Sequence, residues 1–128
     1  MKTKLNEISK EIYEANKLKG FDVKNENLSQ TLLLIVSEIT EAQDALRKKR
    51  APVNWEDHNA QEIWHYGDDE KFKKLFNEHI KDTFEDEIAD TFMRLMDLVG
   101  ALEIDIDSHI ELKRRFNSLR EFKHGKSF

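Results

Sequence analysis

Two pairs of acidic residues are the side chains best placed to do chemistry in this chain. Their members are three residues apart within apolar, helix-patterned segments: Glu38 with Glu41, and Glu87 with Asp90. Residues three apart project from the same face of a helix. If the two helices pack face to face, four carboxylates converge, which is costly unless a cation neutralises them. The residue types therefore predict a site for a hard divalent metal, Mg²⁺ above all.

Acidic pairs at this spacing also occur on solvated helix faces, so their surroundings matter. Both pairs lie beside the most apolar segments of the chain, and apolar or small residues such as Ile39, Ala42 and Ile88 are interleaved with them. We therefore expect these carboxylates to border a core. Two other kinds of metal site do not fit. A di-iron bundle needs two Glu-x-x-His motifs, and residues 62–65 provide one. An EF-hand needs a longer loop than the acidic residues 105–107 supply.

The composition is typical of a single helical domain that spans residues 1–128. Charged residues make up 37% of the chain and hydrophobic residues 38%, with four Gly and one Pro. The net charge is −5 and the basic residues are interspersed, so we expect no binding to long nucleic acid. The absence of cysteine excludes disulfides and thiolate chemistry. The longest aliphatic run, residues 32–36, is too short to span a bilayer. We therefore expect no membrane association and a cytoplasmic location.

The apolar spacing predicts an all-α fold without strands. Long helices are expected at about 3–18, 28–49, 83–99 and 107–121, with a short helix near 69–80.

Polar residues mark the expected starts of these helices. Asn27 and Ser29 are suitable N-caps for the second helix. Two segments resemble capping boxes: residues 82–85, with Asp82 as the cap, and residues 108–111, with Ser108 as the cap.

Taken together, these motifs resemble the MazG-like all-α nucleoside triphosphate pyrophosphohydrolases. That superfamily also holds dimeric dUTPases, dCTP pyrophosphatases and phosphoribosyl-ATP pyrophosphatases. The two acidic pairs resemble its metal signature, and the segments SEITEAQDAL and FEDEIADTFMRLMDLVG resemble its two metal-binding helices. Lys113-x-x-x-Asn117-x-x-Arg120 resembles its C-terminal phosphate-contacting pattern, and residues 124–126 (His-Gly-Lys) resemble the tail of many members.

The resemblance implies a four-helix-bundle-like fold and a Mg²⁺-dependent enzyme, with Mn²⁺ as a substitute metal. Such an enzyme hydrolyses an NTP or dNTP at the α–β phosphate bond to give nucleoside monophosphate and pyrophosphate. The implied metal ligands are Glu38, Glu41, Glu87 and Asp90. The implied catalytic residues are Glu38 and Glu41, with Glu41 as a candidate to orient or deprotonate the attacking water. The family also implies a homodimer or homotetramer.

Three polar residues near the C-terminus are candidates for phosphate binding. Lys113, Asn117 and Arg120 follow helical spacing, so they would share one face and offer donors suited to phosphate oxygens. An ordinary exposed polar face is the alternative. Arg94 follows Asp90 by four residues and is either a further phosphate contact or the partner in an intrahelical ion pair.

Residues 51–80 are the main departure from the family pattern. Forty-five residues separate Glu41 from Glu87, so this segment is interpreted as an elongated connector or insertion. Trp55 and Trp64 lie in it and are candidates either for stacking on a nucleobase or for packing on the domain. Ser37 stands where many members have another acid, which leaves the number of metals open.

A second function class is compatible with the same pattern. Leu33, Leu34 and Phe92 add apolar surface beyond a single helix stripe, which favours association between chains. A non-catalytic helical bundle that acts as an interaction or adaptor protein would use such surfaces and leave the acids solvated. The base and sugar of any nucleotide substrate are not indicated.

Overall fold

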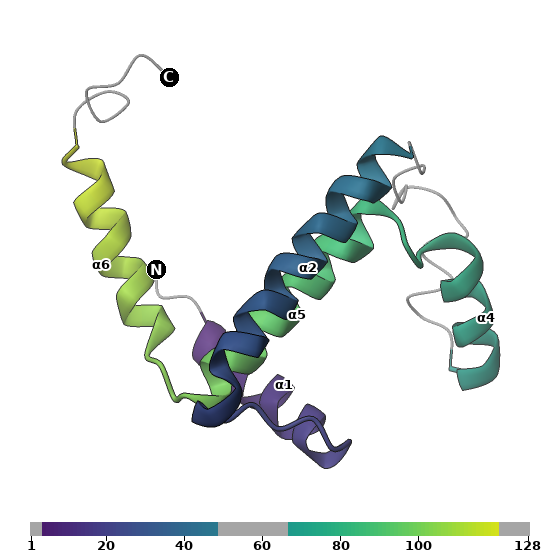
Figure 1. Ribbon diagram of the computed structural model, residues 1–128, viewed down its shortest axis with the longest axis horizontal. Coiled ribbons are helices and arrows are strands. Elements are labelled where there is room, and N and C mark those ends of the chain that lie inside the picture. Colours follow the sequence, from purple (N-terminus) through teal and green to yellow (C-terminus); the bar gives the residue numbers. More distant parts are fainter. Residues whose placement is uncertain (1–3, 49–66, 121–128) are drawn as a thin grey trace. The chain divides into compact units, whose positions relative to one another are not determined.

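The computed structural model describes residues 4–48 and 67–120. Every element within these residues is helical (Figure 1), which confirms the all-α prediction for this part of the chain. The elements are α1 (Leu5–Leu18), the 3₁₀ helix η1 (Asn25–Asn27), α2 (Leu28–Arg47), α4 (Asp69–His79), α5 (Phe84–Ala101) and α6 (Ile106–Ser118). None of the described helices has the length and apolar character needed to cross a membrane.

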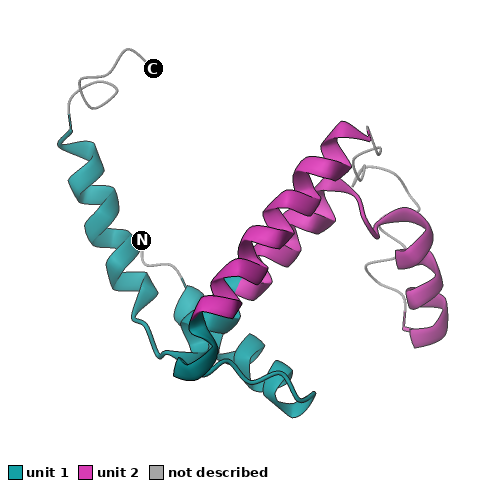
Figure 2. Ribbon diagram, in the orientation of Figure 1, with its two compact units in different colours: residues 1–28, 95–128 teal, residues 29–94 magenta. Residues whose placement is uncertain are grey.

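The chain divides into two compact units (Figure 2). One unit holds residues 29–94, and the other combines residues 1–28 with residues 95–128. The helix α5 contributes its first part to one unit and its last turns to the other. The two pairs of acidic residues predicted to bind metal all belong to the unit of residues 29–94.

In the unit of residues 29–94, α2 lies beside the first part of α5, and the two helices run in opposite directions (Figure 1). The buried residues of α2 recur at intervals of three or four: Ile35, Glu38, Ala42 and Ala45. This spacing defines one buried stripe along the helix. Ala42 and Ala45 are small, which allows a neighbouring helix to approach closely. Glu38 lies in the same stripe, so its carboxylate is on the core side of α2.

The start of α5 is capped one residue later than the sequence predicted. The Thr83 hydroxyl accepts a hydrogen bond from the Asp86 amide at 3.2 Å, and the Asp86 carboxylate accepts one from the Asp82 amide at 3.0 Å. The predicted box with Asp82 as the cap and Glu85 as its partner is therefore wrong. Asp82 has a φ of 64°, a left-handed conformation that precedes the helix and that Asp tolerates better than most residues.

In the other unit, α1 and α6 are joined at their N-termini by an exchange of hydrogen bonds. The Asp107 carboxylate accepts from the amides of Leu5 at 2.9 Å and Asn6 at 3.3 Å. The Asn6 side chain accepts from the Asp107 amide at 3.2 Å. Asp105 caps α6 by accepting from the Ser108 amide, so the prediction of Ser108 as the cap is wrong. An acid of α6 therefore satisfies free amides at the first turn of α1.

A close helix contact explains the glycine near the end of α5. A Cβ atom at Gly100 would overlap the carbonyl group of Ser9 and would lie 2.9 Å from the Cβ of Tyr13. The absence of a side chain therefore lets α1 cross the last turn of α5 at contact distance. Ser9 is 1% exposed, which fits a tightly packed crossing.

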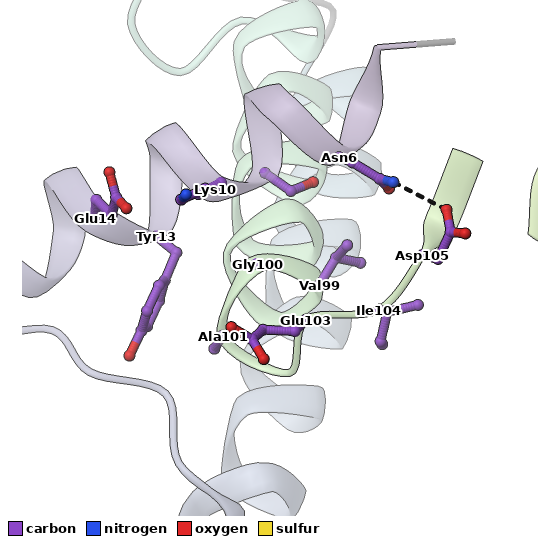
Figure 3. Close-up of a pocket in the computed structure, with 11 residues that line it drawn as sticks. Asn6, Lys10, Tyr13, Glu14, Val99, Gly100, Ala101, Glu103, Ile104 and Asp105 are labelled. Carbon is purple, nitrogen blue, oxygen red and sulfur yellow. Dashed lines mark hydrogen bonds between the residues drawn. The ribbon is translucent and has the colours of Figure 1, made fainter. Parts of the chain in front are cut away.

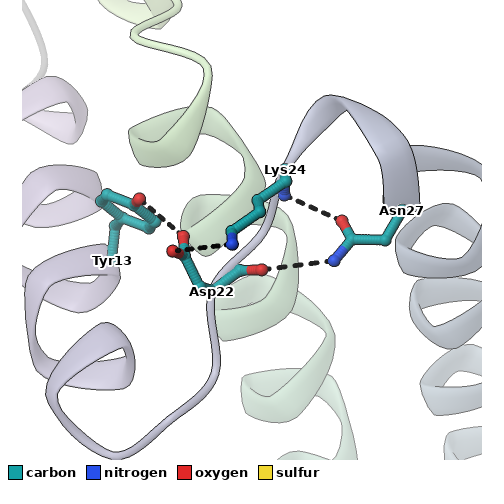
Figure 4. A network of polar contacts seen from close by, with 4 residues as sticks. All are labelled: Tyr13, Asp22, Lys24 and Asn27. Carbon is teal, nitrogen blue, oxygen red and sulfur yellow. Dashed lines mark hydrogen bonds and ion pairs between the residues drawn. The ribbon is translucent and has the colours of Figure 1, made fainter.

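The segment between α1 and α2 is held by a small polar network (Figure 4). The Tyr13 hydroxyl donates to the Asp22 carboxylate at 2.8 Å. The Asn27 side chain donates to the Asp22 carbonyl at 3.2 Å and accepts from the Lys24 amide at 2.8 Å. Asn27 thus organises the turn around η1, and α2 begins at Leu28 as the continuation of that turn.

Candidate metal centre

Three of the four predicted ligands meet between α2 and α5. Glu38 and Glu41 on α2 and Glu87 on α5 each place a carboxylate oxygen so that the three atoms lie within 4.8 Å of one another. These three residues are called the inter-helix cluster below. The three-residue spacing on α2 aligns the first two acids, and the packing of α5 supplies the third. Three like charges at this separation favour a bound cation.

Glu87 is the most deeply placed member of the inter-helix cluster. It is 6% exposed, and among the residues that the structure describes no donor reaches its buried Oε2 atom. Loss of hydration raises the pKa of Glu87 to about 7, and the charge of Glu41 acts in the same direction. A buried carboxylate oxygen without a donor is costly, and a metal ion would remove that cost.

Glu41 lies at the exposed side of the cluster. Its interaction with Glu38, first through a shared hydrogen bond and then through charge repulsion, raises the pKa of Glu41 above its ordinary value. Its carboxylate is therefore easier to protonate than an isolated glutamate while it remains open to solvent. These properties suit a group that takes a proton from water.

Asp90, the fourth predicted ligand, does not belong to the inter-helix cluster. Asp90 is exposed, yet the surrounding protein removes part of its hydration, and this loss is the main cause that raises the pKa of Asp90. The negative charges of Asp86 and Glu38 raise the pKa further. Asp90 is thus close enough to interact electrostatically with the cluster. The three-residue spacing places Asp90 on the same side of α5 as Glu87, one helical turn further along.

Arg94 compensates one carboxylate of the cluster. Its Nε donates to Oε1 of Glu38 at 2.5 Å and joins α5 to α2. The sequence offered Asp90 as the partner for Arg94, and the charge of Arg94 does lower the pKa of Asp90. The hydrogen-bonded ion pair, however, is formed with Glu38. An arginine has five N–H donors, so a single bond leaves the guanidinium with capacity for another anion.

A cavity of about 240 Å³ adjoins the inter-helix cluster. Its lining comprises Glu41, Asp44, Ala45, Lys48, Asp82 and Glu87. The Lys48 ammonium lies 2.8 Å from the Asp44 carboxylate, and this pairing lowers the pKa of Asp44. The sequence interpretation missed Asp44 and Lys48, although they continue the helical spacing of the acids on α2.

Two of the predicted phosphate-binding residues lie over one aromatic ring in the other unit. Lys113 and Arg120 lie over the ring of Phe116, at 5.2 and 5.4 Å from its centroid. The Arg120 Nη1 lies 3.5 Å from the Asn117 side-chain oxygen. Because α6 ends at Ser118, Arg120 lies beyond the helix, and the predicted helix to residue 121 is wrong at this end.

The unit of residues 1–28 and 95–128 contains a larger cavity, of about 450 Å³ (Figure 3). The hydrogen bond from Asn6 to Asp105, 2.9 Å long, lies along its lining. Ser9 also lines it, and among the described residues its hydroxyl has no hydrogen-bond partner. Among the residues that the structure describes, the groups of acids spaced for a metal ion lie in the other unit.

Two predicted sites lie outside the described residues. They are the base-stacking candidates Trp55 and Trp64 and the His-Gly-Lys segment of residues 124–126. Comparisons of the chain with protein-family models, with curated proteins and with solved structures found no match.

Proposed function

We propose that this protein is a Mg²⁺-dependent nucleoside triphosphate pyrophosphohydrolase of the MazG-like kind. The observation that carries the proposal is the inter-helix cluster, with the buried and unpartnered oxygen of Glu87 at its centre. Its donors are all carboxylate oxygens, which Mg²⁺ and Mn²⁺ prefer. Glu38, Glu41 and Glu87 would hold the metal, with Asp90 as a further ligand directly or through water.

The proposed reaction uses the exposed edge of this cluster. When bound, Mg²⁺ neutralises phosphate charge and makes water more acidic. Glu41 orients a water molecule and accepts its proton while the water oxygen attacks the α-phosphorus. A new phosphorus–oxygen bond forms, the α–β anhydride bond breaks, and pyrophosphate leaves from a nucleoside monophosphate. Arg94 and the residues Lys113, Asn117 and Arg120 are proposed as phosphate contacts, and Trp55 and Trp64 as base contacts.

Association of the chain into a homodimer or homotetramer is part of the proposal. α2 exposes large apolar side chains outside its buried stripe: Leu32, Leu33, Leu34, Val36, Ile39 and Leu46. Phe92 and Met93 of α5 are exposed as well. Exposed apolar side chains in this number favour a protein partner. The same observation supports the second candidate function, a non-catalytic interaction or adaptor protein.

A nucleotide screen separates the two functions. The full chain is incubated with each common NTP and dNTP and Mg²⁺, and pyrophosphate and nucleoside monophosphate are quantified. We expect equal amounts of both products from at least one nucleotide. Glu38→Gln and Glu87→Gln should each reduce turnover by about a hundredfold or more, since the metal contributes several kcal/mol.

Asp69→Asn is the matched control, because it removes an exposed acid from the first turn of α4. It should retain wild-type turnover. Absence of pyrophosphate with every nucleotide would favour the adaptor function instead, whereas full activity in both glutamine variants would show that the inter-helix cluster does not hold the catalytic metal.

A further inference from the structure

We propose that the cavity of about 450 Å³ between α1 and the end of α5 binds a small aliphatic diamine, whose ammonium groups pair with the carboxylates of Glu14, Glu103 and Asp105. This space is called the α1–α5 cavity below. It belongs wholly to the unit of residues 1–28 and 95–128. The inference goes beyond the proposed function and does not depend on it.

The walls of the α1–α5 cavity are held in place by contacts within the protein. The missing side chain of Gly100 lets the backbone of Ser9 approach α5 closely. The hydrogen bond of 2.9 Å from Asn6 to Asp105 joins α1 to the turn after α5. Small-molecule sites have volumes of roughly 300–1,000 Å³, and the α1–α5 cavity lies within this range. A ligand would therefore bind a preformed space, which lowers the cost of binding.

Ser9 is the observation that points to a ligand in this space. It lines the cavity, it is 1% exposed, and its hydroxyl has no hydrogen-bond partner among the described residues. A buried hydroxyl without a partner costs free energy. A hydroxyl oxygen accepts hydrogen bonds, and an ammonium group has three N–H donors. A bound amine would therefore satisfy a group that the described part of the chain leaves unsatisfied.

The charge of the lining favours a cation. Glu14, Glu103 and Asp105 each contribute a formal charge of −1 and Lys10 contributes +1, so the lining carries −2 in total. The cavity also lies at the C-terminal end of α5, where the helix dipole places partial negative charge. Lys10 precedes Glu14 by four residues on α1 and can offset only one of the three carboxylates. The remaining charge matches a ligand with two positive groups.

The positions of the carboxylates favour two separate ammonium groups over one compact ion. Figure 3 shows Glu14 and Asp105 at opposite ends of the lining, with Glu103 between them. Three apolar residues also line the cavity: Val99, Ala101 and Ile104. A short chain of methylene groups would gain from contact with these apolar side chains, while its charged ends stay near carboxylates. A hydrated metal ion would gain nothing from the apolar part.

The backbone of Glu103 supports its assignment as a ligand contact. Its amide donates to the Gly100 carbonyl at 3.3 Å, and the Ile104 amide donates to the Val99 carbonyl at 3.1 Å, which is the Schellman pattern at a helix end. Glu103 has a φ of 52°, in the left-handed region where glycine is the usual residue. The chain therefore places a carboxylate at the edge of the cavity although glycine would be less strained there.

Calorimetric titration of the full chain with putrescine, a four-carbon diamine, tests the site. We expect saturable binding of one putrescine per chain in the presence of Mg²⁺. Butylamine has one ammonium group and should bind about fivefold more weakly, since one exposed charge pair is lost. Butanediol has a similar length but no charge and should give no saturable binding.

Substitutions in the lining locate the bound amine. Glu14→Gln combined with Glu103→Gln should weaken putrescine binding by about tenfold, because two exposed charge pairs are lost. Ser9→Ala should weaken binding by about fivefold. Without putrescine, Ser9→Ala should leave the melting temperature unchanged or raise it, because it removes an unsatisfied buried hydroxyl. A residue with a purely structural role would not show this combination.

Two control variants distinguish the cavity from other acidic surfaces. Glu11→Gln is the charge-matched control, because it removes an exposed acid of α1 that does not line the cavity. Glu38→Gln alters the inter-helix cluster. Both should bind putrescine as the wild-type protein does. Circular dichroism checks that each variant keeps its helix content, and Glu103→Gln alone is a milder variant that should still weaken binding.

The outcomes decide the proposal. Absence of saturable putrescine binding to the wild-type protein would overturn it, and so would wild-type affinity in the paired variant. Equal weakening by Glu11→Gln and by the paired variant would show that the amine follows the overall charge and not the cavity. Binding that is lost in Glu38→Gln alone would place the amine at the inter-helix cluster. Because nucleotide hydrolysis is not measured, each result leaves the proposed function to its own test.

Discussion

Arg94 on α5 and Glu38 on α2 form a hydrogen-bonded ion pair across the helix interface, 56 residues apart in the chain. Glu38 is 9% exposed and belongs to the buried stripe of α2, so this pair is the cationic compensation that the protein itself provides to the inter-helix cluster. The pair satisfies one carboxylate of three. The other two carboxylates, of Glu41 and Glu87, carry the negative charge that a bound metal ion would neutralise.

Removal of the Arg94 side chain should therefore affect the metal-free protein more than the metal-bound protein. Arg94→Gln should lower the free energy of unfolding by about 0.5–1 kcal/mol without metal, since the guanidinium is partly exposed. With saturating Mg²⁺ the loss should shrink, because the metal then compensates Glu38. Urea denaturation with and without Mg²⁺ measures both values. An equal loss in the two conditions would show that Arg94 and the metal do not share Glu38.

The raised pKa of Glu87 predicts an unusual dependence of stability on pH. Its value rises from 4.5 to about 7 in the folded protein, so the folded state binds a proton more readily than the unfolded state. The resulting stabilisation is fully present below about pH 4.5 and is lost as the pH rises through 7. The shift corresponds to about 3 kcal/mol. The metal-free protein should therefore become more stable on acidification from about pH 8 to pH 5.5.

Denaturation curves across this pH range provide the measurement, and Glu87→Gln is the diagnostic variant. It should lose most of the pH dependence, because its amide does not titrate. Saturating Mg²⁺ should reverse the trend in the wild-type protein, since protons then compete with the metal for the carboxylates. A wild-type protein whose stability without metal rises with pH over this range would contradict the burial of Glu87.

The capping arrangement of α5 predicts different effects for two hydroxyl residues. Thr83→Ala should lower the free energy of unfolding by about 1 kcal/mol, because the Asp86 amide loses its acceptor. Ser108→Ala should have little effect, since Asp105 supplies the cap of α6. Thermal or urea unfolding of the two variants measures the difference. Equal losses of unfolding free energy in the two variants would indicate that Ser108 caps α6, as the sequence suggested.

The helix crossing at Gly100 predicts that alanine at this position destabilises the protein, which is the opposite of the effect that helix propensity predicts. Alanine normally stabilises a helix interior by about 1 kcal/mol relative to glycine. At Gly100 the added methyl would overlap the Ser9 carbonyl, so Gly100→Ala should destabilise the protein by about 1–3 kcal/mol. Gly67→Ala is the control, because a methyl group added there would meet nothing within 4 Å and no such loss is expected. Increased stability of Gly100→Ala would contradict the close crossing.

The positions of the helices could be predicted from the sequence alone, because helical periodicity is a local property. Each long helix begins and ends within three residues of its expected bounds, and the short helix near residues 69–80 is α4. The same spacing aligned Glu38 with Glu41 on one face of α2, so the alignment of two of the three residues of the inter-helix cluster followed from the sequence. The caps were less accurate, since Asp82 and Asp105 depend on backbone angles and partners that composition does not specify.

The tertiary structure alone decided how the acids differ from one another. The sequence treats Glu87 and Asp90 as equivalent members of a pair, yet packing buries Glu87 between the helices and leaves Asp90 exposed. Arg94 binds Glu38 because α5 packs against α2 at this position, and no local pattern encodes that contact. Burial and long-range pairing depend on which helices touch and in what register. The sequence therefore determined that the acids share helix faces, and only the packing of α2 against α5 determined which carboxylates lose their water.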